Sequence, residues 1–252
     1  MRRILLTGVV LGLMAVALVS GVAVAGTGEK PLVIREGNLI MTINGNAAPT
    51  KLPKYKLTPV SFHASGKIET ADGSHPPALK EVIADVGKTA VIKATDFPTC
   101  TSRKLQATTT AKAEAACKDA IVGRGTATAE IAFPEQAPIP VRSPLLIMNG
   151  GEKDGKVTLL IHAYITVPTP STLITTVTIT RIHKGVYRLH TVSKLPKIAG
   201  GAGSLTSFYF NMNRKGYLWA NCDNGHFAAH VLAKFADGTN ISGSFIRPCI
   251  GT

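Results

Sequence analysis

Alternating apolar and polar residues dominate this 252-residue chain from about residue 58 onwards. In the segment 157–167, Val157, Leu159 and Ile161 share one face and Thr158 lies on the other. Successive side chains of a β-strand point to opposite faces, so this period of two predicts strands with one face in a core. The same pattern recurs in the segments 126–133, 176–180, 208–212 and 227–235.

Short turn motifs separate these predicted strands. Residues that tolerate a positive φ or close a hairpin occur at Asp72-Gly73, Asn149-Gly150-Gly151, Lys184-Gly185, Lys215-Gly216, Asn224-Gly225 and Asp237-Gly238. Strands joined by such turns pair antiparallel. We therefore expect an all-β fold, an antiparallel β-sandwich that is either one large unit or two sandwich-like halves.

One segment has helical periodicity instead. In the alanine-rich residues 108–120, Ala113, Ala116, Cys117 and Ala120 share one face at helical spacing. We expect one short helix here, tethered to the strands by a disulfide of Cys117.

The first 25 residues have the features of a signal peptide. Two arginines precede an apolar run over residues 4–24, and Ala23-Val24-Ala25 is the small-x-small pattern that signal peptidase accepts. This predicts cleavage between Ala25 and Gly26 and a secreted, extracellular protein. An uncleaved run would be long enough to span a bilayer, so the alternative is a chain anchored to the outer face of the membrane.

The remaining residues divide where prolines cluster. We expect an extended N-terminal segment over 26–57, a β-rich half with the helix over 58–140, and a second β-rich half over 141–252. Pro134, Pro138, Pro140 and Pro144 suit an extended linker between the halves.

Four cysteines follow the predicted signal peptide, as expected for an oxidising compartment. Three pairings are possible. Pairing Cys100 with Cys117 and Cys222 with Cys249 keeps each bond within one half, which fits a faint internal repeat of the two halves. Without a Cys-x-x-Cys spacing, we expect these cysteines to have a structural role.

The chain is strongly basic, with 28 lysines and arginines against 15 acidic residues and a net charge of +13. Removing residues 1–25 takes away two arginines and leaves +11. Such a charge favours anionic cell-envelope polymers as partners. The basic residues are scattered rather than clustered, so we expect no specific nucleic acid partner. Membrane contact is expected through an uncleaved N-terminus alone, and the sequence leaves the oligomeric state open.

The histidines do not form a metal motif. His226 and His230 lie in a predicted strand, where four residues span about 13 Å, too far for one ion. Convergence of His162, His183 and His190 from neighbouring strands is an alternative that depends on the pairing register. We predict no metal, no cofactor and no catalytic residue.

Three further motifs have structural explanations. Gly150, Gly155 and Lys156 approach a phosphate-binding loop, but Val157 stands where that loop needs a hydroxyl, so we expect a hairpin turn. Ser204 lacks the Gly-x-Ser-x-Gly pattern of a nucleophile. Tyr217 and Trp219 share a predicted strand face, where we expect them to pack at an edge of the core; an exposed sugar-stacking shelf is the alternative.

Three segments are similar to those of a known group. They are Gly73-Ser74-His75-Pro76-Pro77-Ala78-Leu79-Lys80, the Cys100 to Cys117 segment that continues through Ala116-Cys117-Lys118-Asp119-Ala120-Ile121-Val122-Gly123, and His162-Ala163-Tyr164. The chain thus resembles a group of uncharacterised exported proteins of actinobacteria. This resemblance implies bacterial export and a β-rich fold, and it implies no activity.

Together these observations favour a secreted or cell-wall-associated, non-enzymatic β-sandwich protein. One alternative is an extracellular hydrolase with a Ser/His or carboxylate site. A carbohydrate- or polyanion-binding module is another.

Overall fold

The computed structural model describes residues 30–252, so the predicted cleavage site between Ala25 and Gly26 lies outside the described residues. The strands are β1 (Leu32–Glu36), β2 (Leu39–Ala48), β3 (Lys51–Leu52), β4 (Thr58–Thr70), β5 (Leu79–Gly87), β6 (Ala90–Ile92), β7 (Ile121–Ile131), β8 (Ile139–Lys153), β9 (Lys156–Ile165), β10 (Ser171–Lys184), β11 (Tyr187–Lys194), β12 (Gly203–Met212), β13 (Leu218–Ala220), β14 (His226–Phe235), β15 (Asn240–Pro248) and β16 (Ile250–Gly251). The helices are α1 (Ser102–Leu105) and α2 (Thr110–Ala116), with 3-10 turns η1 (Ala94–Asp96), η2 (Lys118–Ala120) and η3 (Ala199–Gly201).

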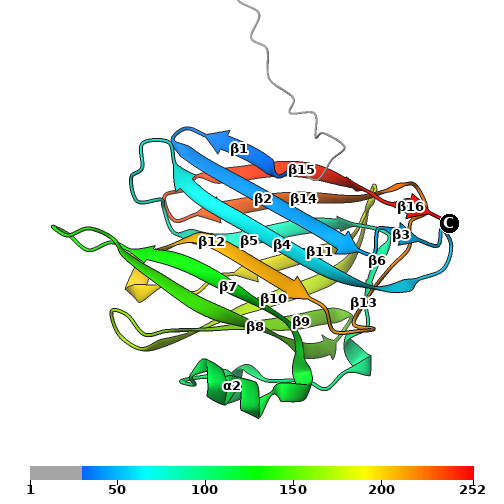
Figure 1. Cartoon of the computed structure of the whole chain (residues 1–252), viewed down its shortest axis with the longest axis horizontal. Helices are drawn as coiled ribbons and strands as arrows, with labels where there is room; N and C mark the ends of the chain where they lie inside the picture. Colours follow the sequence, from blue (N-terminus) through cyan, green and yellow to red (C-terminus); the bar gives the residue numbers. More distant parts are fainter. Residues whose placement is uncertain (1–29) are drawn as a thin grey trace, which may run out of the picture.

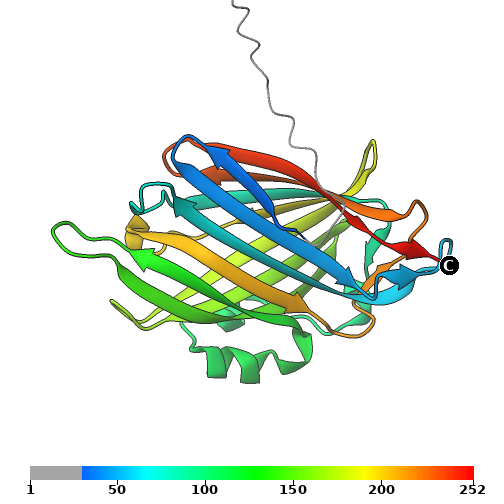
Figure 2. The same cartoon turned by 45° about the horizontal axis from the view of Figure 1, so that its top comes forward.

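Most strands form one antiparallel sheet in the order β1-β2-β4-β12-β7-β8-β9-β10-β11-β5-β14-β15. The all-β, antiparallel prediction is confirmed. Figures 1 and 2 show the sheet curled around its interior until it is nearly closed, with β1 beside β15. The expected sandwich of two layers is therefore corrected to one curled sheet. Twisted strands that each bury one apolar face can enclose a core in this way.

Strands from the two predicted halves alternate within this sheet. β12 lies between β4 and β7, and β5 lies between β11 and β14. Pro134 and Pro138 lie in the turn between β7 and β8, and Ile131 pairs with Ile139 on either side of it. Pro140 and Pro144, expected in an extended linker, lie within β8 instead. Residues 58–140 and 141–252 thus build one sheet together.

The apolar strand faces point into the enclosed interior. One cluster includes Met41, Phe235 and Phe245 near the meeting of β1 and β15, and another includes Ile179 and Leu189. A separate cluster lies where α1 and α2 cover the outer face of β8 and β9. On the rest of the outer face, polar residues predominate, with exposed apolar side chains such as Val33, Tyr209 and Ile246 among them.

The predicted helix forms as α2, with an additional short helix α1 before it. Ala113, Cys117 and Ala120 are buried as the periodicity predicts, but Ala116 is exposed. The helix is shorter than expected because it begins only after Thr109 and ends where Cys117, with a φ of −132° and a ψ of 29°, leaves helical geometry. The Thr109 hydroxyl caps α2 by accepting the backbone N–H of Lys112 at 3.4 Å.

The sheet edges β1 and β15 meet through side chains. A Cβ at Gly243 of β15 would lie 2.5 Å from Cδ1 of Ile34 of β1, so glycine lets the two edges approach. The buried Arg247 of β15 donates to the carbonyl of Gly45 at 2.9 Å, to Oδ1 of Asn44 at 2.8 Å and to the carbonyl of Lys30 at 3.2 Å. These bonds fasten β15 to β2 and to the chain before β1.

Within residues 30–252, no helix has the length and apolar character that a bilayer crossing requires.

Candidate functional site

Charged residues are divided unevenly between the two ends of the curled sheet. At one end of the curled sheet, the strands β2, β5, β8, β12 and β15 reach their last residues. We call this end the basic end. It is marked by the labels β3, β13 and β16 in Figure 1. The antiparallel register shows that these strand ends lie at the same end of the sheet. Near it, Ala48 of β2 pairs with Ser61 of β4, and Met212 of β12 pairs with the neighbouring Phe62.

The connections at the basic end are residues 49–57, 88–120, 154–155, 185–186, 213–225 and 249–252. They carry eleven cations, Lys51, Lys54, Lys56, Lys88, Lys93, Arg103, Lys104, Lys112, Lys118, Arg214 and Lys215. They carry five acids, Asp96, Glu114, Asp119, Asp154 and Asp223. The connections at the opposite end carry one cation, Lys197, and three acids, Asp72, Glu135 and Asp237. Most of the excess positive charge of the connections therefore lies at the basic end. Arg103, Lys104 and Lys112 are the exceptions, because they belong to the α1–α2 segment that runs along the outer face of β8 and β9.

A basic hollow of about 370 Å³ lies at this end, between η2, the start of β7 and the turn after β12. Lys118, Arg124, Arg214 and Lys215 line it with exposed side chains, and Asp119 is the acid among the lining residues. Four cations around one hollow create a positive potential that attracts anions.

Glu114 of α2 offsets one of these cations. Arg124 donates to its carboxylate at 2.5 Å, and this hydrogen bond lowers the pKa of Glu114. The side chains of Lys118, Arg214 and Lys215 have no acidic partner within residues 30–252. Those three groups remain available to a ligand.

The floor of the hollow depends on a close strand contact. Gly123 of β7 faces β12, where a Cβ would meet the carbonyl of Asn211 at 2.7 Å. Glycine is required for this approach, which brings Arg124 beside Arg214 and Lys215 although ninety residues separate them in the chain.

A buried hydrogen-bond network supports one wall. The Tyr217 hydroxyl donates to Oδ1 of Asn149 at 3.0 Å, and burial raises the pKa of Tyr217. Nδ2 of Asn149 in turn donates to the carbonyls of Ala94, Phe97 and Pro98. The Arg214 guanidinium lies 5.7 Å from the centre of the Phe97 ring, a cation–π contact. Asn149 thus holds two connections of the basic end in place.

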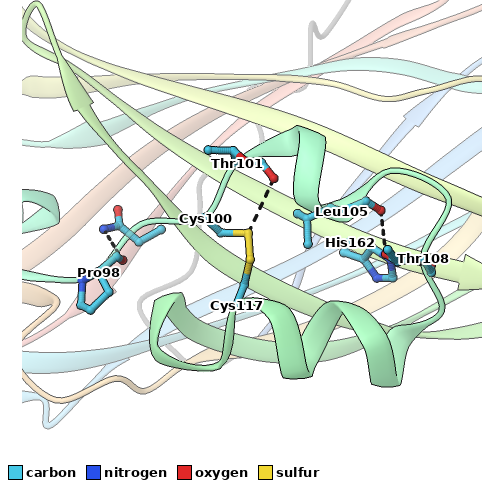
Figure 3. Close-up of a disulfide and its surroundings, with 8 residues drawn as sticks. Pro98, Cys100, Thr101, Leu105, Thr108, Cys117 and His162 are labelled. Atoms are coloured by element: carbon cyan, nitrogen blue, oxygen red, sulfur yellow. Dashed lines mark hydrogen bonds between the residues drawn. A yellow bond between two sulfur atoms is a disulfide. The ribbon is translucent and has the colours of Figure 1, made fainter.

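The other wall depends on a disulfide. Cys100 and Cys117 are bonded, as predicted, and Lys118 follows directly (Figure 3). Cys222 and Cys249 form the second bond, also as predicted. Two disulfides are typical of an oxidising, extracellular environment.

The three histidines that could converge lie apart. His162 is 0% exposed beneath the link between α1 and α2, where it contacts Thr108 (Figure 3). His183 is exposed near the end of β10, and Nδ1 of His190 lies 2.6 Å from Oδ1 of Asp85. No cluster of these three forms.

A polar row that the sequence analysis missed crosses the outer sheet face. Asp85 of β5 pairs in register with His190 of β11 and with His230 of β14. His230 pairs with Ser244, whose Oγ lies 2.9 Å from Nδ1 of His230. The sequence analysis did not single out Asp85, because strand order was needed to find its neighbours. Across residues 30–252, no three histidine, cysteine or acidic side chains are arranged to hold a metal ion.

The remaining motifs have structural roles. Asp154 and Gly155, both with positive φ, form the turn between paired Lys153 and Lys156, so the hairpin interpretation of this motif is confirmed. Ser204 is buried in β12. Tyr217 is 1% exposed and its hydroxyl bonds inward to Asn149, so it packs in the core as expected and the alternative of a Tyr217–Trp219 sugar shelf does not form.

A second hollow, of about 410 Å³, lies at the opposite end and is lined by polar residues including Glu36, Asn38, His75 and Asp237. Neither hollow includes Asp85, His190, His230 or Ser244.

Comparisons with family models, curated proteins and solved structures found no match to this chain. The resemblance to exported actinobacterial proteins therefore stays a prediction.

Proposed function

We propose that this protein is a non-enzymatic component of the cell exterior that binds anionic envelope polymers through its basic end. The observation that carries the proposal is the basic hollow, with Lys118, Arg214 and Lys215 exposed and free of acidic partners in residues 30–252. A polymer with repeated negative charges can contact this hollow and the neighbouring lysines together.

Export is part of the same proposal. The predicted signal peptide and the two disulfides both favour the extracellular side, where such polymers lie. We expect the mature chain to begin at Gly26. N-terminal sequencing of the exported protein measures this directly, and a start at Met1 in the membrane fraction would support the anchored alternative.

A hydrolase is the alternative with some geometric support, since Asp85 and His190 are hydrogen-bonded and His230 contacts Ser244. A hydrolytic site must also hold the reacting atom of a substrate close to both nucleophile and base. These four residues lie on the outer face of the sheet and outside both hollows, which favours the non-enzymatic role.

The test uses residues 26–252 and soluble polyphosphate as the probe. Replacing Lys118, Arg124, Arg214 and Lys215 with glutamine should weaken binding by about tenfold or more, because each removes a charge from the hollow. The matched control replaces two exposed arginines and two exposed lysines remote from the basic end, Arg35, Lys80, Arg142 and Lys197. Both variants lose four charges, so a general effect of net charge cancels.

Affinity of the unmodified protein should also fall steeply as salt rises, since the cations are exposed and salt screens them. Equal weakening by the two variants would show that scattered charge, and not the hollow, binds the polymer. That result would contradict the assigned site.

A further inference from the structure

A second feature of the basic end is an exposed apolar tip. It consists of Lys51, Lys54, Tyr55, Lys56, Leu57 and Ile250, and we call it the tip. Tyr55 is 93% exposed, Ile250 is 61% exposed and Leu57 is 37% exposed. These three apolar side chains, on the segments joined by the pairing of β3 with β16, are exposed to solvent.

The base of the tip is firmly held. β3 pairs with β16 in parallel, so Lys51 lies beside Ile250. The backbone N–H of Lys54 donates to the carbonyl of Thr252 at 3.0 Å, and that of Cys222 donates to the carbonyl of Pro53 at 3.0 Å. The Cys222–Cys249 disulfide ties together the two segments that flank this small sheet.

The side chain of Tyr55, in contrast, contacts nothing that would hold it. It has no hydrogen bond or ring contact with any residue of 30–252. A rigid base therefore presents a free aromatic side chain outward, which lowers the ordering cost of binding.

Charge around the tip has one sign. Between Glu36 and Glu69 the chain has no acidic residue, and residues 249–252 have none. Asp223, next to Cys222, is already paired with Lys88 at 3.2 Å. Lys51, Lys54 and Lys56 thus accompany the apolar side chains of the tip, and no acidic side chain pairs with them within residues 30–252.

Lysines together with exposed apolar side chains favour a lipid bilayer over a soluble polymer as the partner of the tip. A polyanion needs the lysines but leaves Tyr55, Leu57 and Ile250 in water. A bilayer with anionic headgroups satisfies both sets, because lysines attract the headgroups while tyrosine and aliphatic side chains enter the interface.

We propose that the tip docks the protein on an anionic lipid bilayer. The inference rests on the proposed function in one respect, that the basic end faces the envelope. It adds a lipid contact at a site separate from the hollow. With one small apolar insertion, binding should be weak, reversible and dependent on anionic lipid.

The experiment measures co-sedimentation of residues 26–252 with vesicles of phosphatidylcholine alone and of phosphatidylcholine with phosphatidylglycerol. Binding is expected to the anionic vesicles. Each lysine of the tip changed to glutamine should lower the partition coefficient about fivefold. The variant Tyr55→Ser with Leu57→Ser should lower it about tenfold while polyphosphate binding stays unchanged.

The matched control is Tyr209→Ser with Val33→Ser, which removes a tyrosine and an aliphatic side chain about half exposed elsewhere on the sheet. It should leave vesicle binding unchanged. A Tyr55→Trp variant supplies a second readout, since insertion should shift its fluorescence to shorter wavelength beyond any change from Trp219 in the unmodified protein.

The proposal would be overturned by two results together: anionic-vesicle binding that is unchanged in the Tyr55→Ser, Leu57→Ser variant, and no shift in the fluorescence of the Tyr55→Trp variant on vesicle binding. This holds even if the lysine variants bind the vesicles more weakly. Polyphosphate binding without vesicle binding would overturn it while leaving the proposed function intact. If the protein bound neither polyphosphate nor anionic vesicles, both the proposed function and the proposed lipid contact would be contradicted.

Discussion

At the residue scale, His162 shows how burial sets protonation. Its Nε2 lies 3.1 Å from the carbonyl of Thr108, and the Thr172 hydroxyl donates to that same carbonyl at 2.9 Å. Its Nδ1 is buried without a hydrogen-bond partner in residues 30–252. Burial lowers the pKa of His162 below the ordinary value of 6.5. A proton on Nδ1 would be a buried donor without an acceptor, so the folded state keeps this ring neutral.

His162 should therefore make stability depend on pH. Below about pH 6.5 the unfolded chain takes up the proton first, so the free energy of unfolding falls as pH falls, down to the lowered pKa of the folded state. The slope is limited to about 1.4 kcal/mol per pH unit. His162→Gln keeps a donor for Thr108 and removes the titration. Urea unfolding of both proteins across this range measures the difference, and parallel pH profiles would contradict the assignment.

At the element scale, the helical cap depends on its covalent tether. α2 has seven residues, too few to be stable alone in water. It is held by the Cys100–Cys117 bond, by the Thr109 cap and by the burial of Leu105 and Ala113. The same tether positions Lys118 at the hollow.

Removing this bond with Cys100→Ala and Cys117→Ala should cost about 3 kcal/mol of stability, as expected for a loop of 17 residues. Hydrogen exchange should rise mainly in residues 94–120, and polyphosphate binding should weaken. The comparison variant, Cys222→Ala with Cys249→Ala, opens a loop of 27 residues and should instead loosen β3 and β16. Equal exchange profiles for the two variants would show that neither bond acts locally.

At the scale of the whole molecule, closure of the sheet depends on contacts between its two edge regions. Arg247 carries its charge into a buried position, and burial lowers its pKa. Carbonyl oxygens of β2 and of Lys30 and the face of the Phe245 ring replace the lost water. The residue thus joins β15 to β2 and to the chain before β1.

Arg247→Met should lower the free energy of unfolding by about 2–4 kcal/mol, because buried acceptors lose their donors. Hydrogen exchange should rise in β1, β2 and β15 before the other strands. Arg35→Met, at an exposed position on β1, should change stability by less than about 0.5 kcal/mol. Chemical denaturation of both variants compares them, and similar losses would show that closure does not depend on Arg247.

Local patterns were enough to predict many of the strands and turns. They did not indicate β1 and β2, which form within the expected extended segment 26–57, and the disulfide pairing was predicted from the proposed repeat of two halves. Alternation at Val157 and Leu159 is a property of neighbouring residues, and so are the Asp154-Gly155 turn and the helical spacing of Ala113 and Cys117. Each follows from backbone geometry within a few residues.

Strand order and the two surface sites required the tertiary structure. No local pattern indicates that β12 lies between β4 and β7, or that Asp85 has His190 and His230 as neighbours. Lys118 and Arg214 share a hollow because the closing sheet brings their connections together. The composition determined that the chain is basic, but only the fold places Lys118, Arg124, Arg214 and Lys215 around one hollow. Strand pairing over long distances depends on how all the apolar faces are buried together, and no single segment encodes that arrangement.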